Sequence, residues 1–155
     1  MSTAVTWQTT TKESSETEAL AEKLGAALRG GEVIELASDL GGGKTTFTRG
    51  LARGAGSKNV VASPTFTISK YYTAPKFDIH HFDFYRLAEP GLMTDTLAEV
   101  IGDPHVVTVV EWGEIVSHVL PTERLSVHIA YAANGNRKLT FSAPHTLHYL
   151  MEAVK

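Results

Sequence analysis

With 155 residues, the chain has the length of one domain, and its lack of cysteine excludes disulfide bonds, thiolate metal sites and a cysteine nucleophile. Lys and Arg total 14 against 17 Asp and Glu, without a basic cluster, which excludes a stand-alone nucleic-acid binder that neutralises phosphates by itself. No apolar run approaches the roughly 20 residues that span a bilayer, and the N-terminus lacks a basic segment followed by an apolar one, so we expect a cytoplasmic protein without membrane contact.

The N-terminal part predicts a strand, a helix and a second strand. The first strand is expected at residues 5–10, and the helix at about residues 16–28, with Ser14 or Ser15 as its N-cap. The pair of glycines at 30–31 ends this helix. The apolar run at residues 33–37 then predicts the second strand.

A glycine-rich loop follows this strand and precedes a helix expected at residues 47–55. It reads Ser-Asp-Leu-Gly-Gly-Gly-Lys-Thr-Thr at positions 38–46. Glycines let successive N–H groups point at one anion at the positive end of the helix. In such a phosphate-binding loop, Lys44 holds the β- and γ-phosphates of a nucleoside triphosphate and Thr45 ligates Mg²⁺. Ser38 stands where the Gly-x-x-x-x-Gly-Lys-[Ser/Thr] pattern has glycine, which weakens the match without cancelling it. The alternative is a glycine-rich turn with a chance lysine.

The remaining sequence alternates strand and helix signals and predicts an α/β fold with a mixed sheet. Residues 106–110 are apolar without alternation, which is typical of a strand in the middle of a sheet. The other expected elements are a strand starting near Val60, a loop at 63–65, a hairpin of strands 66–72 and 77–84, a helix at 94–101, a hairpin of strands 125–131 and 138–142 around Asn134-Gly135-Asn136, and a helical segment from His145.

Glu111 is the first candidate acid for holding Mg²⁺ or positioning water. It ends the buried run 106–110, and α/β proteins place ligand-facing groups at the C-terminal edge of the sheet. It is therefore a Walker B-like acid, and the alternative is a solvated acid that begins a loop. Trp112 beside it could stack on a ring or cover the sheet edge. Thr65 could sense Mg²⁺ or the γ-phosphate, or serve as a plain turn residue.

Asp83 is the second candidate acid. The period of two in a strand places His81, Asp83 and Tyr85 on one face. The alternative for Asp83 is a strand-end salt bridge to Arg86. A transition-metal site is disfavoured, because His80 points away from the face that carries His81 and Asp83.

Four ordered segments together resemble one known family. They read Asp-Leu-Gly-Gly-Gly-Lys-Thr-Thr at 39–46, Ser-Pro-Thr-Phe at 63–66, His-Phe-Asp-Phe-Tyr-Arg at 81–86, and Val-Glu-Trp at 110–112. In this order and spacing the chain resembles the bacterial TsaE family, formerly YjeE, the ATPase of tRNA threonylcarbamoyladenosine biosynthesis. The resemblance spans most of the chain.

The resemblance implies a single P-loop nucleotide-binding domain over residues 1–155, with a three-layer P-loop NTPase-type fold whose parallel core is flanked by antiparallel strands. It implies an ATPase that is weak alone and faster with partners, uses ATP and Mg²⁺, and resets the complex of the TsaD and TsaB subunits between turnovers. tRNA would be reached only through that complex, and we expect a monomer or weak self-association.

The resemblance also implies roles for individual residues. Lys44, Asp83 and Glu111 would be catalytic, and Thr45, Asp83 and Glu111 would ligate Mg²⁺. The adenine base would lie between Ser14 and Gly135. The nucleotide-binding residues would be Ser14, Leu40, Gly41, Gly42, Gly43, Lys44, Thr45, Thr46, Thr65 and Gly135.

Two other classes of protein remain open at this point. A small-molecule kinase of the phosphate-loop class fits the length, but such kinases close an arginine-bearing lid, and the arginines after the loop's helix are few: Arg86, Arg124 and Arg137. A binding module that needs ATP bound but not cleaved is the second. A regulatory GTPase is disfavoured, because no Asn-Lys-x-Asp segment is present to bind guanine.

Overall fold

The computed structural model describes residues 4–38, 43–62, 69–85 and 91–155. In chain order the elements are β1 (Val5–Thr11), α1 (Ser14–Ala27), β2 (Val33–Ser38), α2 (Lys44–Gly54), β3 (Ser69–Thr73), β4 (Asp78–Asp83), α3 (Leu92–Val100), β5 (Val106–Glu111), η1 (Gly113–Val116), β6 (Leu125–Tyr131), η2 (Ala133–Gly135), β7 (Arg137–Ala143), η3 (His145–Leu147) and α4 (His148–Val154). The η elements are single 3₁₀ turns. None of the helices in the described ranges is long and apolar enough to cross a membrane.

The strands form one seven-stranded sheet in the order β1-β7-β6-β2-β5-β4-β3. β6, β2, β5 and β4 run parallel to one another, whereas β7 and β1 on one side and β3 on the other pair antiparallel. The predicted mixed sheet with a parallel core and antiparallel flanks is therefore confirmed. β5 lies between β2 and β4, as its unbroken apolar run predicted.

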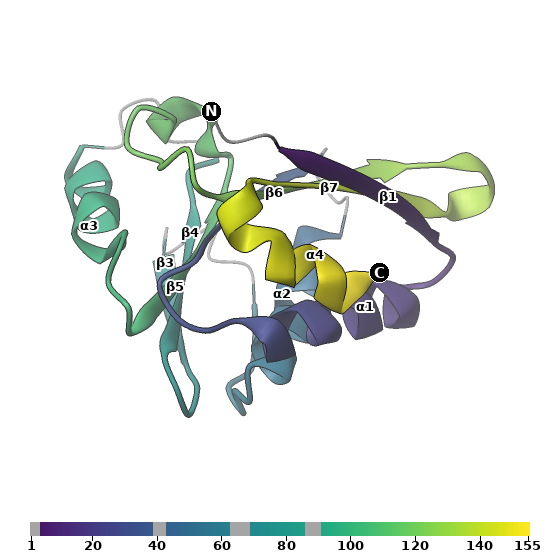
Figure 1. The fold of residues 1–155 in the computed structure, drawn as a ribbon, viewed down its shortest axis with the longest axis horizontal. Helices are drawn as coiled ribbons and strands as arrows, with labels where there is room; N and C mark the ends of the chain where they lie inside the picture. The colour runs from purple at the N-terminus through teal and green to yellow at the C-terminus, as the bar shows by residue number, and fades with distance from the viewer. Residues whose placement is uncertain (1–3, 39–42, 63–68, 86–90) are drawn as a thin grey trace.

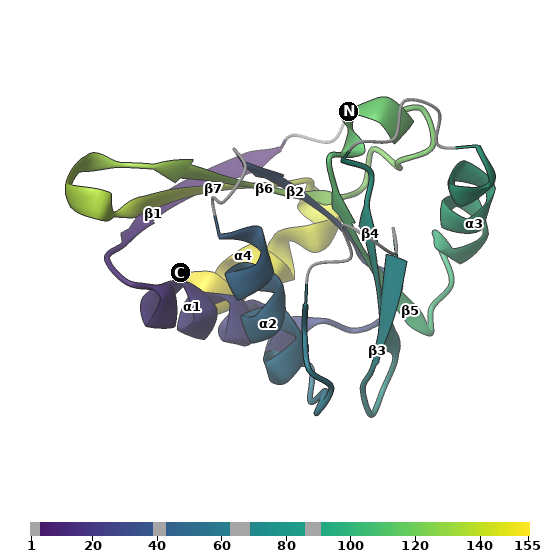
Figure 2. The same ribbon diagram turned by 180° about the vertical axis from the view of Figure 1, so that it is seen from behind.

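Helices cover both faces of the sheet and give the fold three layers. Figures 1 and 2 show α1, α2 and α4 together on one face, with α3 on the other side of β4 and β5. Alternate side chains of β5 point to opposite faces of the sheet. Val107 and Val109 belong to the core under α1, α2 and α4. Val110 joins the smaller core that contains Leu97 of α3 and Val116 of η1. This separation follows from the period of two in a strand.

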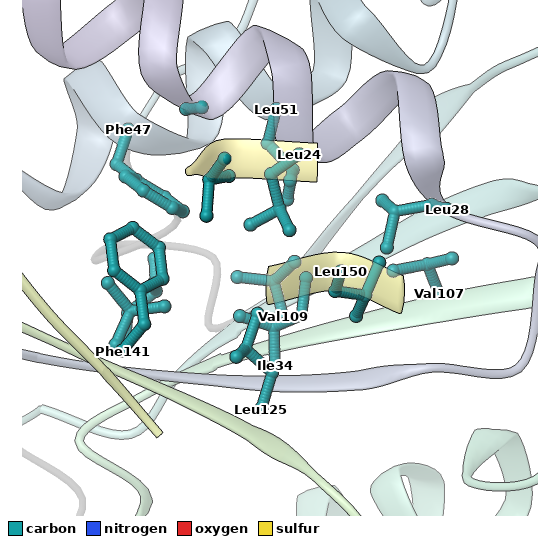
Figure 3. Packing of buried hydrophobic residues seen from close by; sticks show 14 of the residues in the cluster. Leu24, Leu28, Ile34, Phe47, Leu51, Val107, Val109, Leu125, Phe141 and Leu150 are labelled. Atoms are coloured by element: carbon teal, nitrogen blue, oxygen red, sulfur yellow. The ribbon is translucent and has the colours of Figure 1, made fainter. Parts of the chain in front are cut away.

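The larger core fixes the position of α2 on the sheet. Figure 3 shows Phe47 and Leu51 of α2 facing side chains of the sheet, among them Phe141 of β7. These three side chains are fully buried. Burying a side chain of this size contributes about 1.5–3 kcal/mol, so the start of α2 is held firmly against the strands.

Glycines allow α1 and α2 to approach closely. A β-carbon at Gly50 would lie 2.1 Å from the Glu18 carbonyl oxygen, and one at Gly54 would lie 2.0 Å from the Glu22 carbonyl oxygen. From α1, a β-carbon at Gly25 would lie 2.0 Å from the Leu51 oxygen. The two helices therefore touch through their backbones, at a separation that larger residues do not permit.

The predicted N-cap of the first helix is wrong. Ser14 is the first helical residue, and Glu13 takes the extended cap conformation with φ −139° and ψ 159°. The backbone N–H groups of Glu16 and Thr17 donate to the Glu13 carbonyl at 3.1 and 3.2 Å. The Glu16 carboxylate accepts a hydrogen bond from the Lys12 N–H, which lies before the helix, and the cap residue Glu13 makes no side-chain hydrogen bond to the helix start.

Other boundaries differ by a few residues. The helix predicted at 94–101 begins two residues earlier, at Leu92, because Gly91 supplies the turn into it with a φ of 52°. The strand expected near Val60 is absent from the described residues 60–62. The predicted loop at 63–65 and the start of the strand at 66–72 lie outside the described residues. The hairpin between β3 and β4 is confirmed, with Thr73 opposite Asp78.

Candidate functional site

The candidate site lies at the C-terminal edge of the parallel core. Glu111 at the end of β5 is in register with Asp83 at the end of β4 and with Leu36 near the end of β2. β2 ends at Ser38, and α2 begins at Lys44. Because the C-terminal ends of parallel strands share one edge, the two predicted acids and the start of α2 come together.

The start of α2 has the backbone geometry of an anion site. Gly43 occupies the N-cap with a left-handed φ of 102°, a conformation that glycine adopts without strain. The N–H groups of the first helical turn have no partner within the helix and carry the positive end of its dipole. Anions bind such a helix start by their charge and by these N–H groups.

Lys44 is held at this helix start with its ammonium group inside the site. The residue is only 8% exposed. Its Nζ lies 3.4 Å from the Ser38 carbonyl oxygen and 4.7 Å from the centre of the Trp112 ring. It therefore bridges the end of β2 and the residue that follows Glu111, where a phosphate bound at the helix start would meet its charge.

The other predicted residues of the loop divide into two groups. Thr45 and Thr46 are half-buried in the first turn of α2. Leu40, Gly41 and Gly42 lie outside the described residues, as does Thr65. Their predicted contacts with phosphates and Mg²⁺ stay predictions.

The two acids are buried at the strand ends. Asp83 is 3% exposed, and its Oδ1 accepts a hydrogen bond from the Tyr85 N–H at 2.9 Å. The alternative of a salt bridge to Arg86 concerns a residue outside the described ranges. Glu111 is 2% exposed, so the alternative of a solvated acid is wrong for this residue. Carboxylate oxygens of this kind are the ligands that Mg²⁺ prefers, and Asp83 and Glu111 bring two of these groups to one edge of the sheet.

His81 binds Glu111, a contact that sequence reasoning did not predict. Its Nε2 and the Glu111 Oε2 are hydrogen-bonded, and both side chains are buried. On the other side of the ring, Nδ1 lies 3.3 Å from the Tyr72 hydroxyl, which donates to the Ala62 carbonyl at 2.9 Å. Burial raises the pKa of the Tyr72 phenol, opposed by the Ala62 hydrogen bond and assisted by the charge of Glu111, so the hydroxyl keeps its proton.

Trp112 packs against the smaller core and lies tilted against another aromatic ring. It has a left-handed φ of 58°, unusual for a large side chain, and its ring lies 4.8 Å from the Tyr85 ring. One side of the indole packs on the smaller core, and Lys44 lies over its face. It covers the sheet edge and also borders the site.

A cavity of about 370 Å³ opens next to the start of α2. The predicted residues Ser14, Gly43, Thr46 and Gly135 all line it, so the two positions assigned to the nucleotide base are brought to the same space as the end of the loop. Figure 1 shows the tip of the β6–β7 hairpin and the start of α1 at the same end of the molecule. The volume is within the range of small-ligand pockets.

Sequence reasoning missed four residues of this cavity. They are Lys12, Glu13, Thr17 and Arg137. The Arg137 guanidinium donates a hydrogen bond to the Gly135 carbonyl oxygen at 2.9 Å. Its position two residues after Gly135 in the sequence could have indicated that it lies at the cavity. The others flank Ser14 in the sequence.

The residues present fit a nucleotide with Mg²⁺. A β-carbon built on Gly43 meets no atom of the described residues within 4 Å, so none of them fills the space beside the helix start. Lys12 and Arg137 line the cavity and Lys44 lies at the start of α2, so they would bring positive charge to a bound phosphate, and Thr45, Asp83 and Glu111 carry the oxygen atoms that would hold Mg²⁺. The donors and this space agree with the chemistry that the loop sequence predicts.

Comparison with known proteins identifies the family. The family model described as "Threonylcarbamoyl adenosine biosynthesis protein TsaE" matches residues 11–139. A Bacillus subtilis relative named tRNA threonylcarbamoyladenosine biosynthesis protein TsaE is 39% identical over 137 residues, covering 88% of this chain and 84% of the relative. A Treponema pallidum relative of the same name is 37% identical, covering 76% and 86%.

A solved structure has the same fold. The crystal structure of Bacillus subtilis YdiB superposes with a TM-score of 0.79 at 35% identity, covering 99% of this chain and 95% of that one. The sheet order, the residues at its C-terminal edge and these matches agree, and the chain belongs to the TsaE family of threonylcarbamoyl adenosine biosynthesis proteins.

Proposed function

We propose that this protein is a Mg²⁺-dependent P-loop ATPase that supports tRNA threonylcarbamoyladenosine formation by acting on a complex of TsaD and TsaB. One observation carries the ATPase proposal. Lys44 at the start of α2 lies against the residue after Glu111, and Glu111 is in register with Asp83. A phosphate-binding helix start and two buried acids thus share one sheet edge, which is the arrangement that phosphoryl transfer to water requires.

Catalysis would rest on charge and positioning. Lys44 and the N–H groups at the start of α2 would stabilise the negative charge that develops on the transferred phosphoryl group. Thr45, Asp83 and Glu111 would hold Mg²⁺, which would supply further positive charge at the phosphates. One of the two acids would also orient the attacking water. Burial at the sheet edge strengthens each of these interactions by lowering the local dielectric.

The cavity between α1 and the β6–β7 hairpin would receive the nucleoside. Its lining by Ser14, Gly135 and Arg137 places backbone and side-chain polar groups around a space next to the helix start. A triphosphate bound at α2 would therefore direct its ribose and base toward this cavity. Adenine is the proposed base, with the TsaE family as support.

The proposed partners follow from the family and from the chemistry. The relatives are named for threonylcarbamoyladenosine biosynthesis, and a chain of this kind would supply ATP-dependent work to a transferase without being the transferase. A partner that contributes a cation to the phosphates would accelerate hydrolysis strongly, as arginine fingers do. We therefore propose slow turnover by the chain alone and faster turnover with TsaD and TsaB.

The test is ATP turnover by the purified chain with and without TsaD and TsaB, in the presence and absence of Mg²⁺. Replacing Lys44 by alanine should lower turnover by roughly 100-fold, because a positioned cation at the transferring phosphate is lost. Lys58→Ala is the matched control, since Lys58 is exposed beyond the end of α2 and should leave the rate unchanged. Turnover that persists in Lys44→Ala, or that needs no Mg²⁺, would contradict the proposal.

A further inference from the structure

The Glu111 carboxylate is held by a neighbouring strand. His81 Nε2 and Glu111 Oε2 are hydrogen-bonded, and the two side chains are 0% and 3% exposed. β4 and β5 are adjacent and parallel, with His81 opposite Val109 and Asp83 opposite Glu111. The imidazole therefore reaches Glu111 from two residues before Asp83, on the same face of the sheet.

The imidazole is itself held from its other side. The hydroxyl oxygen of Tyr72 in β3 lies 3.3 Å from His81 Nδ1. The same hydroxyl donates a hydrogen bond to the Ala62 carbonyl oxygen at 2.9 Å. Three adjacent strands and the backbone after α2 thus contribute to one line of contacts: Ala62 O, Tyr72 Oη, His81 and Glu111. Because both ring nitrogens have partners, the plane of the imidazole is fixed.

We propose that His81 and Tyr72 are positioning residues for Glu111. The bond from His81 occupies Oε2 and sets the plane of the carboxylate, so Oε1 is the oxygen left to act on a metal ion or a water molecule. A glutamate side chain has several rotatable bonds, and a single ring bonded on both sides restrains its end. This inference rests on the proposed function of Glu111 in ATP hydrolysis.

The neighbouring histidine provides a built-in comparison. His80 is as deeply buried as His81, but it faces the opposite side of the sheet, between the rings of Tyr71 and Phe82. Replacing either histidine by leucine removes a buried imidazole from β4. Only the change at residue 81 removes a contact with Glu111.

The experiment compares His81→Leu, His81→Gln, Tyr72→Phe and His80→Leu with the unchanged protein. Turnover is measured with TsaD and TsaB at saturating ATP over a range of Mg²⁺ concentrations, and each rate is corrected for the folded fraction. We expect His81→Leu to lower kcat by roughly 10- to 100-fold, the usual effect of losing a group that orients a metal ligand. The KM for ATP should change little, because His81 is not among the described residues that line the cavity.

The conservative variants make the prediction specific. His81→Gln retains an N–H donor that can reach Glu111 and should recover a large part of the lost kcat. Tyr72→Phe keeps the ring but removes the hydroxyl, and it should give a smaller loss than His81→Leu. His80→Leu should retain the kcat of the unchanged protein. Equal losses for His80→Leu and His81→Leu, or no recovery in His81→Gln, would overturn the inference.

A measurement without nucleotide separates this inference from the proposed function. Nuclear magnetic resonance of the selectively labelled protein reports the imidazole nitrogens of His81 and the carboxyl carbon of Glu111. Glu111→Gln should move the His81 resonances and leave those of His80 in place, and His81→Leu should move the Glu111 carboxyl resonance. Unchanged spectra would overturn the positioning role, whereas shifted spectra in a protein that hydrolyses no ATP would contradict only the ATPase proposal.

Discussion

His80 is a buried histidine whose ring contacts are aromatic. Its ring centre lies 3.8 Å from that of Tyr71 and 4.0 Å from that of Phe82, and its two nitrogens have no hydrogen-bond partner among the described residues. Burial, assisted by the charge of His81, lowers the pKa of His80 from 6.5 to about 4. The folded protein therefore keeps this imidazole neutral.

The stability of the fold should fall in mild acid because of His80. As pH drops below 6.5, the unfolded chain takes up the proton before the folded protein does, so stability is complete above 6.5 and is lost toward pH 4. The loss attributable to this group is at most roughly 3 kcal/mol. Urea unfolding of the unchanged protein and of His80→Leu at several pH values measures it. The free-energy profiles should converge or cross toward pH 4, and parallel profiles would contradict the assignment.

At the scale of single residues, the sequence predicted the ends of strands better than the contacts between them. Asp83 and Glu111 were placed at the site because each ends a strand with a recognisable pattern. The bond from His81 to Glu111 joins two strands, and nothing in the local sequence states that β4 lies beside β5. The sequence predicted which face of its strand His81 lies on. It did not predict Glu111 as the partner of His81, because that contact depends on the order of the strands in the sheet.

At the scale of elements, the contact between α1 and α2 determines where the helix start of the site lies. Gly50 and Gly54 are one turn apart on α2, and each meets a carbonyl oxygen of α1. A shift of α2 away from α1 would carry Lys44 and Thr45 with it. The close packing of the two helices is thus a condition for the geometry of the site.

Gly50→Ala should destabilise the protein, although alanine favours an isolated helix by about 1 kcal/mol over glycine. The added methyl group would lie 2.1 Å from the Glu18 oxygen, and overpacking of this kind costs about 1–3 kcal/mol. Chemical denaturation measures the change. Arg49→Ala, at the exposed neighbouring position on α2, is the control and should change stability by less than about 0.5 kcal/mol. A gain in stability for Gly50→Ala would contradict the close approach.

Helices and strands were largely predicted from local patterns. The strand β5 and the turn at Asn134-Gly135 are determined by residues that are adjacent in the sequence, so local patterns predict them. The two turn residues have left-handed φ values of 61° and 75°. The cap of α1 was missed because a serine was favoured by propensity, whereas Glu13 takes the cap position and its backbone carbonyl accepts from the first helical N–H groups. Spacing alone does not decide which of several polar residues takes that position.

At the scale of the whole molecule, segments that are far apart in the sequence meet at one cavity. Ser14 from α1 and Gly135 from the β6–β7 hairpin lie far apart in the sequence and line the same space. The resemblance to the family placed them there, since no local pattern relates the start of one helix to a distant turn. The pairing of β1 with β7, which brings these segments together, was likewise not predicted.

Ser14→Tyr should block nucleotide binding by filling the cavity. Nucleotide with Mg²⁺ at about 100 times its Kd should stabilise the unchanged protein by about 2.7 kcal/mol, seen as a rise in Tm. The rise should be largely lost in Ser14→Tyr. Ser15→Tyr is the matched control, because Ser15 is also exposed at the start of α1 but is absent from the described lining of the cavity. Equal behaviour of the two variants would place the nucleoside elsewhere.

The pairing of β1 with β7 also has a consequence for the order of events during synthesis. Val5 lies opposite Ala143 and Thr11 opposite Arg137, so β1 leaves the ribosome well before β7, the strand with which it pairs. Contacts of such long sequence separation form late and slowly. Since the cavity is bounded by the segments that this pairing aligns, a nascent chain cannot be stabilised by nucleotide in that cavity. The newly synthesised chain must therefore pair β1 with β7 before a bound nucleotide can stabilise the fold.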